Sequence, residues 1–412
     1  MVLFIFSLQS QFKLMKQLKD RIQQLAQDNQ AQIVAIRRHL HENPELSFQE
    51  FNTAKFIATT LRGFGLEVQE GIANTGLVVL IKGKNPSKKT IALRADIDAL
   101  PIQEENTVSY KSKVEGVMHA CGHDVHTSSL IGTATILHSL QAEFEGTVKL
   151  IFQPAEEKAP GGAITMIKEG VLQSPAPTII LGQHVCPIIP VGKVGFTKGT
   201  VMASADEIYI TVKGKGGHAA SPHAAVDPIL ITSHIIVALQ QIVSRNTDPI
   251  KPCVLSICQI KAGEATNVIP EVVHLAGTLR TISEEWRKEA HKKITSLCQS
   301  IAEGMGGSCE VNIGQGYPPT YNDPILTERT FEATCTYMGH ENVHYMDMNM
   351  GGEDFAYYAQ QIPGCFYMIG VQNTAMGIDS FVHTPTFNVD EKVLEIAPGL
   401  MAWLALHELA IE

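Results

Sequence analysis

The stretch TIALRADID, residues 90–98, decides the fold because it joins an apolar run to two carboxylates. Residues 90–95 have the composition of a buried strand, and Asp96 and Asp98 follow it directly. In sheets that are covered by helices, ligands bind beyond the carboxyl ends of the strands. We therefore expect this strand to bring two acidic side chains to a functional site.

Two later strands end in the same way. Residues 147–152 are followed by Glu156 and Glu157, and residues 178–182 are followed by His184. Helical patterns alternate with the strands, which predicts the α/β class with a mixed central sheet flanked by helices. The helices expected here cover residues 15–42, residues from a Ser-x-x-Glu capping box at Ser47 and Glu50 to Gly63 or Gly65, and residues 124–140.

The pattern changes near Gly199. Strands are expected at residues 208–212, 254–260 and 272–279, with helices from Asp227-Pro228 to about residue 243 and over residues 283–303. A block of this size fits a small α+β domain that is inserted into the first fold. We therefore divide the chain into the first part of a catalytic domain (15–198), an inserted domain (199–313) and the second part of the catalytic domain (314–412).

Composition narrows the classes of function. The 412 residues exceed one ordinary core and carry a net charge of −10, so we expect neither a nucleic-acid nor a membrane partner. The eight cysteines form no regular framework and no export signal precedes them, which favours reduced thiols in the cytoplasm. Residues 1–14 are expected to be an over-extended start or a disordered tail, and no other stretch reaches the length of a membrane span.

The tract MHACGHDVH, residues 118–126, offers metal ligands. Cys121 and His123 lie one residue apart, and Gly122 allows the backbone to fold so that both face one ion. Asp124 suits either the N-cap of the following helix or a hydrogen bond that supports the ligands. The alternative is a buried cysteine beside ordinary histidines.

The tract QPAEE, residues 153–157, places two carboxylates after an apolar strand. Such a pair is usually part of a solvated surface, but charges that close a buried strand are costly unless they are paired or bind metal. Because adjacent side chains diverge, one glutamate can bind a metal while the other acts as a base.

Two single histidines, His184 and His383, complete the set, although a lone histidine is more often structural. With Cys121, His123 and a glutamate they make five donors of a kind that suits zinc or manganese. Five donors are too many for one tetrahedral site. They fit two ions that share a bridging group and leave positions open for water and substrate.

Much of the chain, from RHLH at residues 38–41 to His383, resembles the N-acyl-amino-acid amidohydrolases. These are the aminoacylase-like, hippurate and auxin-conjugate hydrolases within the wider carboxypeptidase-G-like family of co-catalytic zinc metallopeptidases. The motifs that carry the resemblance stand in the expected order: RADIDALP (94–101), CGHD (121–124), QPAEE (153–157), GKGGHAA (214–220), NVIP (267–270) and GEDF (352–355).

The resemblance implies a zinc-exopeptidase-like catalytic domain with an inserted ferredoxin-like lid and dimerisation domain. It implies two divalent ions per subunit, zinc or manganese with cobalt also accepted, held by Cys121, His123, Glu157, His184 and His383. Glu156 would be the general base for a metal-activated water, and Asp98 would orient the ligands, with Asp96 close to it. Asp96 together with Cys121 indicates the amidohydrolase branch rather than the dipeptidases.

The implied reaction is hydrolysis of the amide bond of an N-acyl amino acid, which releases a carboxylic acid and a free amino acid. His218 would stabilise the oxyanion in the partner subunit's site of a homodimer, and Asn267 and Arg280 would bind the substrate carboxylate. Otherwise His218 is a flexible surface histidine between small residues, and the other two are polar residues at strand ends.

Three other functions stay open on the sequence alone. One is a dipeptidase or aminopeptidase of the same fold. Another is a thiol amidase with Cys121 as nucleophile and His123 or His126 as its base, which leaves the glutamate pair without a role. The third is a protein that binds metal and dimerises without catalysis, and the intact Glu156 argues against it.

Overall fold

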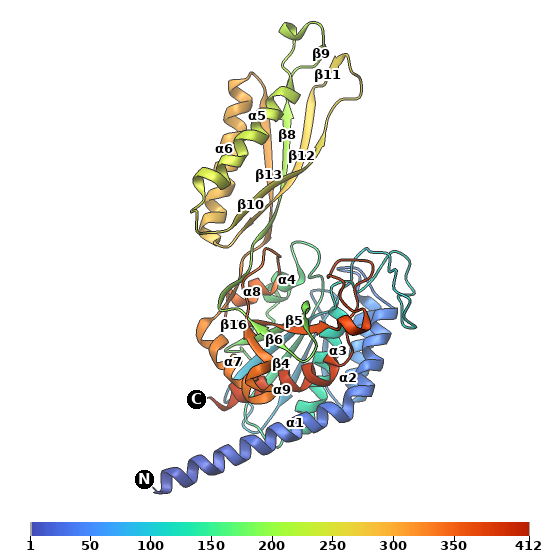
Figure 1. Ribbon diagram of the computed structural model, residues 1–412, viewed down its shortest axis with the longest axis vertical. Coiled ribbons are helices and arrows are strands. Elements are labelled where there is room, and N and C mark those ends of the chain that lie inside the picture. Colours follow the sequence, from blue (N-terminus) through green and yellow to red (C-terminus); the bar gives the residue numbers. More distant parts are fainter. Residues whose placement is uncertain (1, 412) are drawn as a thin grey trace. The chain divides into compact units, whose positions relative to one another are not determined.

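The computed structural model describes residues 2–411, and the side chains of all of these except residues 2–14 and Gln315. The expectation for residues 1–14 therefore falls outside the described side chains. The chain forms two compact units. Figure 1 shows the chain coloured from blue at the N-terminus to red at the C-terminus. The first unit contains Met1–Gly199, Tyr321–Asp347 and Tyr357–Glu412, and the second contains Thr200–Thr320 and Met348–Ala356.

The first unit is built on an eight-stranded sheet in the order β1-β2-β4-β3-β5-β16-β6-β15. The four strands β4, β3, β5 and β16 are parallel to one another, whereas the β1–β2, β2–β4 and β16–β6 pairs are antiparallel. The predicted mixed central sheet is thus confirmed. Its strands are β1 (Val68–Ile72), β2 (Gly76–Lys82), β3 (Thr90–Asp96), β4 (Thr147–Gln153), β5 (Ile180–Pro190), β6 (Val194–Phe196), β15 (Val343–Tyr345) and β16 (Gly364–Gln372).

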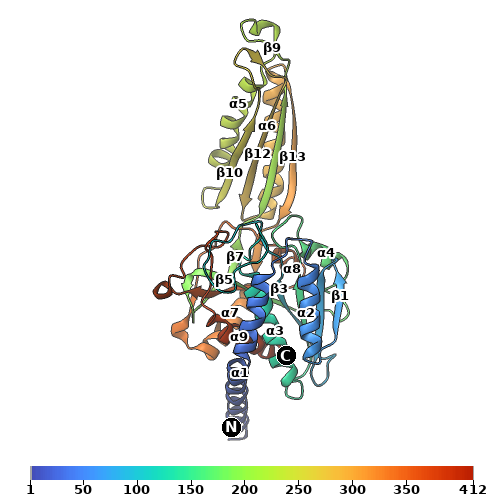
Figure 2. The same ribbon diagram turned by 90° about the vertical axis from the view of Figure 1, so that its right-hand side faces the viewer.

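Helices α1, α3 and α9 pack against one another, and α3 and α9 also lie against β3. Helix α2 lies beside β1 at one edge of the sheet (Figure 2). Helix α1 begins at Val2, before the expected residue 15. The helices in and beside this unit are α1 (Val2–Glu42), α2 (Phe51–Gly63), α3 (His123–Ser139), α4 (Gly162–Lys168), α7 (Pro324–Met338), α8 (Phe355–Ala359) and α9 (Val393–Ala410).

Helix α3 is buried on nearly every side. Its hydroxyl groups are satisfied both within the helix and by its neighbours: Ser128 Oγ donates to the carbonyl of Asp124 (2.7 Å), and Thr127 Oγ1 donates to the carbonyl of Asp96 on β3 (2.7 Å). Gly132 allows α9 to approach closely, because a Cβ atom at this position would lie 2.9 Å from the Cβ of Pro398. The helix is therefore a rigid support for the residues at its N-terminus.

The second unit is a four-stranded antiparallel sheet, β10-β12-β8-β13, on which α5 and α6 pack. The inserted α+β fold is thus confirmed, but the edge strand β13 was not predicted. Its alternation of short polar and apolar residues is a weak signal that is typical of a half-exposed edge. The elements are β8 (Ala205–Lys213), β9 (Gly217–His218), α5 (Pro228–Gln241), β10 (Cys253–Lys261), β11 (Val268–Ile269), β12 (Val272–Thr281), α6 (Glu284–Gly304) and β13 (Ser308–Tyr317), with a separate pair of short strands, β7 (Gly199–Met202) and β14 (Thr320–Asn322).

Two helices have the length and hydropathy of a membrane span, so the expectation that no further stretch reaches this length is wrong. One is α9, whose apolar window is 78% buried, and its hydropathy is that of a central core helix. The other is Pro228–Asn246, which contains α5 and the turn after it, and its window is 33% buried. Length and composition alone are weak evidence for a membrane span.

The predicted capping box at Ser47 and Glu50 does not form. Helix α2 begins at Phe51 without a side-chain cap. Glu50 instead accepts a hydrogen bond from the backbone N–H of Ala155 (2.9 Å), and Ser47 Oγ donates to Asp98 Oδ2 (2.6 Å). Both side chains are buried, so they satisfy other buried polar groups rather than the helix terminus.

A buried ion pair joins α1 to α3. Arg37 Nε donates to Asp124 Oδ2 (2.7 Å), and each side chain is at most 1% exposed. His41 Nδ1 lies 2.8 Å from the same carboxylate oxygen. The N-cap position of α3 is Gly122, so the alternative in which Asp124 caps this helix is wrong. Asp124 anchors α1 instead.

Replacing Arg37 by alanine should lower the free energy of unfolding by about 3–5 kcal/mol, because Asp124 is left buried without its cation. Arg38→Ala is the matched control. The Arg38 side chain, which pairs with Glu391, is 45% exposed, so its removal should lower the free energy of unfolding by less than about 1 kcal/mol. Urea denaturation of both variants measures the difference. Equal losses would contradict the role given to the buried pair.

Candidate metal centre

Cys121 lies at the centre of the candidate site. It stands on the turn before α3, where Gly122 occupies the N-cap position with a φ of +86°. The Sγ atom lies 3.4 Å from His184 Nε2 and 3.3 Å from His383 Nε2. The backbone N–H of His383 donates to the carbonyl of Ala120 (2.7 Å), which ties the C-terminal loop to this turn.

Two groups of three donor atoms share the Cys121 sulfur. One group is Cys121, His123 and His184, and the other is Cys121, Glu157 and His383. Within each group the donor atoms lie within 4.8 Å of one another, which is close enough for the ligands of one ion. The structure therefore brings all five sequence-predicted ligands together, with one sulfur common to both groups.

The imidazoles of His123 and His184 are oriented through their Nδ1 atoms. His123 Nδ1 lies 3.2 Å from Asp98 Oδ1, and His184 Nδ1 lies 2.7 Å from the carbonyl oxygen of Val185. Such an oxygen acceptor places the proton on Nδ1 and leaves the Nε2 lone pair for a metal. His184 was expected at the end of a strand, but it lies inside β5, which continues to Pro190.

The buried carboxylate of Asp98 organises the glutamate pair. It accepts hydrogen bonds from the backbone N–H groups of Glu156 (3.1 Å) and Glu157 (3.0 Å), and from Ser47 Oγ. The same carboxylate contacts the ring of His123. Asp98 therefore fixes one metal-ligand candidate and the backbone of both glutamates, which is the orienting position expected for it.

The two glutamates lie on a bend after β4, and their carboxylates converge. Glu156 Oε2 lies 3.9 Å, and Glu157 Oε1 lies 3.8 Å, from His123 Nε2. Glu157 Oε1 also lies 3.3 Å from His383 Nε2. The expected divergence of adjacent side chains holds for an extended strand, but Ala155 has a φ of +53° and ends the strand before them.

Two atoms in this cluster are buried without a hydrogen-bond partner among the described residues. They are His123 Nε2 and Glu157 Oε1. A buried polar atom that lacks a partner costs free energy, so such atoms call for an explanation. Divalent ions ligated by these atoms, one in each donor group, would supply it, and the thiol, imidazole and carboxylate donors around them fit such ions.

The charges of the site point the same way. Burial alone would lower the pKa of His123, but Asp96 and Asp98 raise it to about 10. Burial and then the charges of Glu157 and Glu156 raise the pKa of the Cys121 thiol well above its usual range. Both shifts express an excess of carboxylate charge that favours a cation.

The thiol amidase reading does not fit this geometry. A buried thiol with a raised pKa is not an activated nucleophile. The ring nitrogens near Cys121 Sγ belong to His184 and His383 rather than to His123 or His126, the bases proposed for it.

Two buried residues beside the site were not predicted to support it: Glu50 was expected only in a capping box, and His126 only as a base of the thiol amidase alternative. Glu50 binds the backbone of Ala155, and its only sequence signal was the misleading capping pattern. His126 Nδ1 lies 2.6 Å from Asp96 Oδ1, and its Nε2 accepts from the N–H of Val185 (2.9 Å). Its position three residues after a ligand on the same helix could have revealed it.

The remaining predicted site residues belong to the second unit. His218 on β9 pairs with Val268 on β11, and the N–H of Ala219 donates to the carbonyl of Asn267 (3.0 Å). His218 and Asn267 therefore lie together. Arg280 stands near the other end of β12, so the structure does not bring it to them within this unit.

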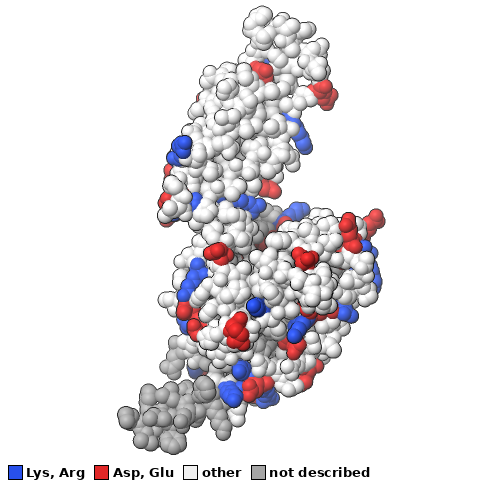
Figure 3. All heavy atoms as spheres, in the orientation of Figure 1, with Lys and Arg blue, Asp and Glu red and all other residues white. Residues whose placement is uncertain are grey.

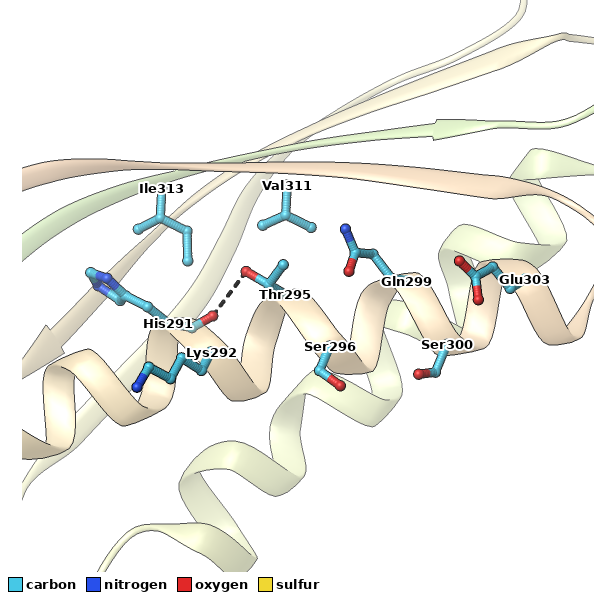
Figure 4. Close-up of a pocket in the computed structure, with 9 residues that line it drawn as sticks. All are labelled: His291, Lys292, Thr295, Ser296, Gln299, Ser300, Glu303, Val311 and Ile313. Carbon is cyan, nitrogen blue, oxygen red and sulfur yellow. Dashed lines mark hydrogen bonds between the residues drawn. The ribbon is translucent and has the colours of Figure 1, made fainter.

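A cavity of about 530 Å³ lies between α6 and β13 in the second unit (Figure 4). Its lining is mostly polar side chains of α6, with Val311 and Ile313 from β13. Its histidine, His291, is bound to Asp206 (2.7 Å), and none of the metal-donor groups in the described part of the chain includes a residue of this cavity. The chemistry therefore concentrates at Cys121 and not here.

The chain is similar to known hydrolases over most of its length. The model of Peptidase family M20/M25/M40 matches residues 92–407. N-acetylcysteine deacetylase of Bacillus subtilis is 42% identical over 375 residues, which cover 91% of this chain and 96% of that protein. Thermostable carboxypeptidase 2 of Saccharolobus solfataricus is 40% identical over 377 residues, which cover 91% and 94%. The solved structure of the YXEP protein of Bacillus subtilis, described as a dinuclear metal binding peptidase, has a TM-score of 0.80 at 37% identity and covers 93% of this chain and 99% of that one.

Substituting alanine for Gly122 should weaken the binding of divalent metal by about tenfold or more, because an added Cβ would lie 2.5 Å from Val185 Cγ2 and displace the ligand turn. Gly116→Ala is the control, because its φ of +71° imposes similar backbone strain with no atom within 4 Å of the added Cβ. Titration of the metal-depleted variants with Co²⁺ measures the affinities. Equal affinities would show that the turn does not position the ligands.

Proposed function

Since the chain belongs to peptidase family M20/M25/M40, we propose that it hydrolyses the amide bond of N-acyl amino acids with a metal-activated water and a glutamate base. One observation carries the proposal. Two donor groups share the Cys121 sulfur, and the Glu156 carboxylate lies 3.9 Å from His123 Nε2 beside them. A structural metal site needs no such base, so the geometry favours catalysis over metal binding alone.

The substrate class follows from what the relatives share. The relative from B. subtilis is named for removing acetyl from N-acetylcysteine, and the relative from S. solfataricus is named a carboxypeptidase. Both names describe an amide whose amine side carries a free α-carboxylate. We propose a small acyl group on the other side, and cleavage of a dipeptide is the alternative outcome.

The ligand set is Cys121, His123, Glu157, His184 and His383, and its mixture of donors suits two zinc or manganese ions, with cobalt also accepted. Such ions would polarise the amide carbonyl and lower the pKa of the attacking water towards ~7.

Glu156 removes a proton from that water and delivers it to the leaving amine, which is worth ~10²–10⁴ in rate. Asp98 holds the backbone of Glu156 through a hydrogen bond of 3.1 Å, so the base needs no reorganisation before it acts.

Arg280 is the candidate for the substrate carboxylate. Its guanidinium is partly buried, and none of the hydrogen bonds among the described residues starts from it. An added Cβ on Gly352 would lie 3.2 Å from its Nη1, so a glycine-containing segment leaves room beside it. A partly buried guanidinium with free donors is suited to a bidentate carboxylate.

His218 and Arg280 cannot reach one substrate from the same copy of the second unit. Figure 1 shows β9 and β11 at one end of its sheet, and Arg280 lies at the far end of β12. From Val272 to Arg280 the strand advances about 27 Å, at about 3.4 Å per residue. We therefore propose a homodimer in which His218, with Asn267 beside it, serves the site of the partner subunit.

The outer face of α5 suits the contact between two such copies. Ile229, Leu230 and Val237 are 48%, 51% and 74% exposed there, and Figure 3 shows few charged side chains over this part of the unit. A second copy that presents the same face would remove these side chains from water. The eight cysteines are all unpaired, which supports a reducing, cytoplasmic setting.

The proposed activity is tested by hydrolysis of N-acetylmethionine, hippurate, an indole-acetyl amino acid and a dipeptide before and after chelation. We expect metal-dependent cleavage of at least one N-acyl amino acid. Glu156→Gln should reduce kcat by ~10²–10⁴ and retain its metal, which metal analysis of the purified variant checks. Loss of metal in this variant would instead make Glu156 a ligand, and cleavage of the dipeptide alone would indicate a peptidase.

Co-expression of His218→Ala and Glu156→Gln chains tests the dimer. Each variant alone should be nearly inactive, whereas a mixed dimer has one site with an intact Glu156 and a partner's intact His218. Random pairing should restore about a quarter of the activity, because half of the dimers are mixed and half of their sites are complete. No restoration in verified mixed dimers would place His218 in its own subunit's site or outside catalysis.

A further inference from the structure

His126 has no place in the metal centre as described so far. It lies on α3 three residues after His123, and it is fully buried. Together with Asp96 and His123 it forms a group whose donor atoms are close enough to hold an ion. The hydrogen bonds of its ring nevertheless point to another role.

Both ring nitrogens of His126 are already used. Nε2 lies 2.9 Å from the backbone nitrogen of Val185, whose N–H can only donate, so Nε2 must be the acceptor. The ring proton therefore stands on Nδ1 and is donated to Asp96 Oδ1 at 2.6 Å. Asp96 Oδ2 in turn accepts from Arg94 Nη1 (2.7 Å). Neither nitrogen keeps a lone pair for a metal, so His126 is not a ligand.

Val185, whose backbone N–H is bound by His126, also orients His184. The N–H of Val185 donates to His126, and the carbonyl of Val185 accepts from His184 Nδ1 (2.7 Å). The rings of His126 and His184 meet edge to face, with centroids 4.6 Å apart. As a result, His184 presents Nε2 to Cys121 Sγ at 3.4 Å.

We propose that Asp96 and His126 form a positioning pair that sets the orientation and tautomer of His184 for metal binding, through the backbone of Val185. The proposal rests on the ligand set of the proposed function. It gives Asp96 a defined task, which the sequence left uncertain. Asp96 fixes the tautomer of His126, and His126 can then accept from Val185 and hold β5 against α3.

The test measures Co²⁺ binding to metal-depleted, full-length protein by chelator competition and by the visible absorption of bound Co²⁺. His126→Ala should lower the affinity for one of the two Co²⁺ ions by roughly 10–100-fold, which is the usual loss of metal affinity when the group that orients a ligand is removed. Its Co²⁺ spectrum should change in the d–d region, while the sulfur charge-transfer band of Cys121 remains. The matched control is Ile131→Ala, a cavity variant of a buried apolar side chain on the same helix that takes no part in these hydrogen bonds.

Two conservative variants separate positioning from folding. Glutamine at position 126 places an amide oxygen near the position of Nε2 and can accept from Val185, whereas asparagine reaches only the position of Nδ1 and keeps only the contact with Asp96. We therefore expect His126→Gln to bind Co²⁺ clearly more tightly than His126→Asn. If His126→Ala does not fold, this comparison is the test of the positioning role.

Wild-type affinity and spectrum in His126→Ala, or equal binding by the glutamine and asparagine variants, would overturn the positioning role. A loss no larger than that of Ile131→Ala at the same melting temperature would do so as well. Failure of the wild-type protein to bind Co²⁺ is a distinct result, because it would remove the ligand set itself and the proposed function with it.

Discussion

A carboxylate that is buried away from water must be hydrogen-bonded or neutralised. The side chain of Asp98 is buried, so the residues around it must supply these hydrogen bonds. This requirement is met by three separate segments: the loop with Ser47, the bend with Glu156 and Glu157, and the ring of His123 at the start of α3. None of these contacts is local in sequence. The position of the base relative to the ligands is therefore a consequence of satisfying one charge, and the surrounding core makes that charge inaccessible to water.

The candidate ligands could be identified from the sequence because they stand in short tracts of thiol, imidazole and carboxylate side chains at the ends of elements. Cys121 and His123 flank a glycine before a helix, and Glu156 and Glu157 follow an apolar strand. The supporting groups could not be predicted in the same way. Ser47 and Glu50 have the spacing of a capping box, and only their hydrogen bonds over 51 and 105 residues show that they bind Asp98 and Ala155 instead. At these positions the need to hydrogen-bond buried polar atoms over long sequence distances outweighs the local preference for a helix cap.

The fold was predictable to a similar depth. Strongly apolar strands such as β3 and β4 and the helices α5 and α6 were located to within a few residues. Asp227 caps α5 as expected, and Ser283, predicted only as the approximate start of a helix, caps α6. The edge strand β13 was missed, because its apolar residues Cys309, Val311 and Ile313 alternate with exposed polar ones and are followed by two glycines. The separation of His218 from Arg280 could not be predicted either. Both belong to the inserted domain, and only the length of β12 shows that they lie at opposite ends of its sheet.

The link between Cys121 and His383 also bears on how the protein is made. The first donor group is complete within one short stretch of synthesis, because Cys121 and His184 are 63 residues apart. The second waits for a residue 262 positions beyond Cys121. A growing chain therefore contains all donors of the first group well before it contains those of the second. An ion held by the second group would close a very large loop, so its uptake would require a chain that has been made and folded at least as far as His383.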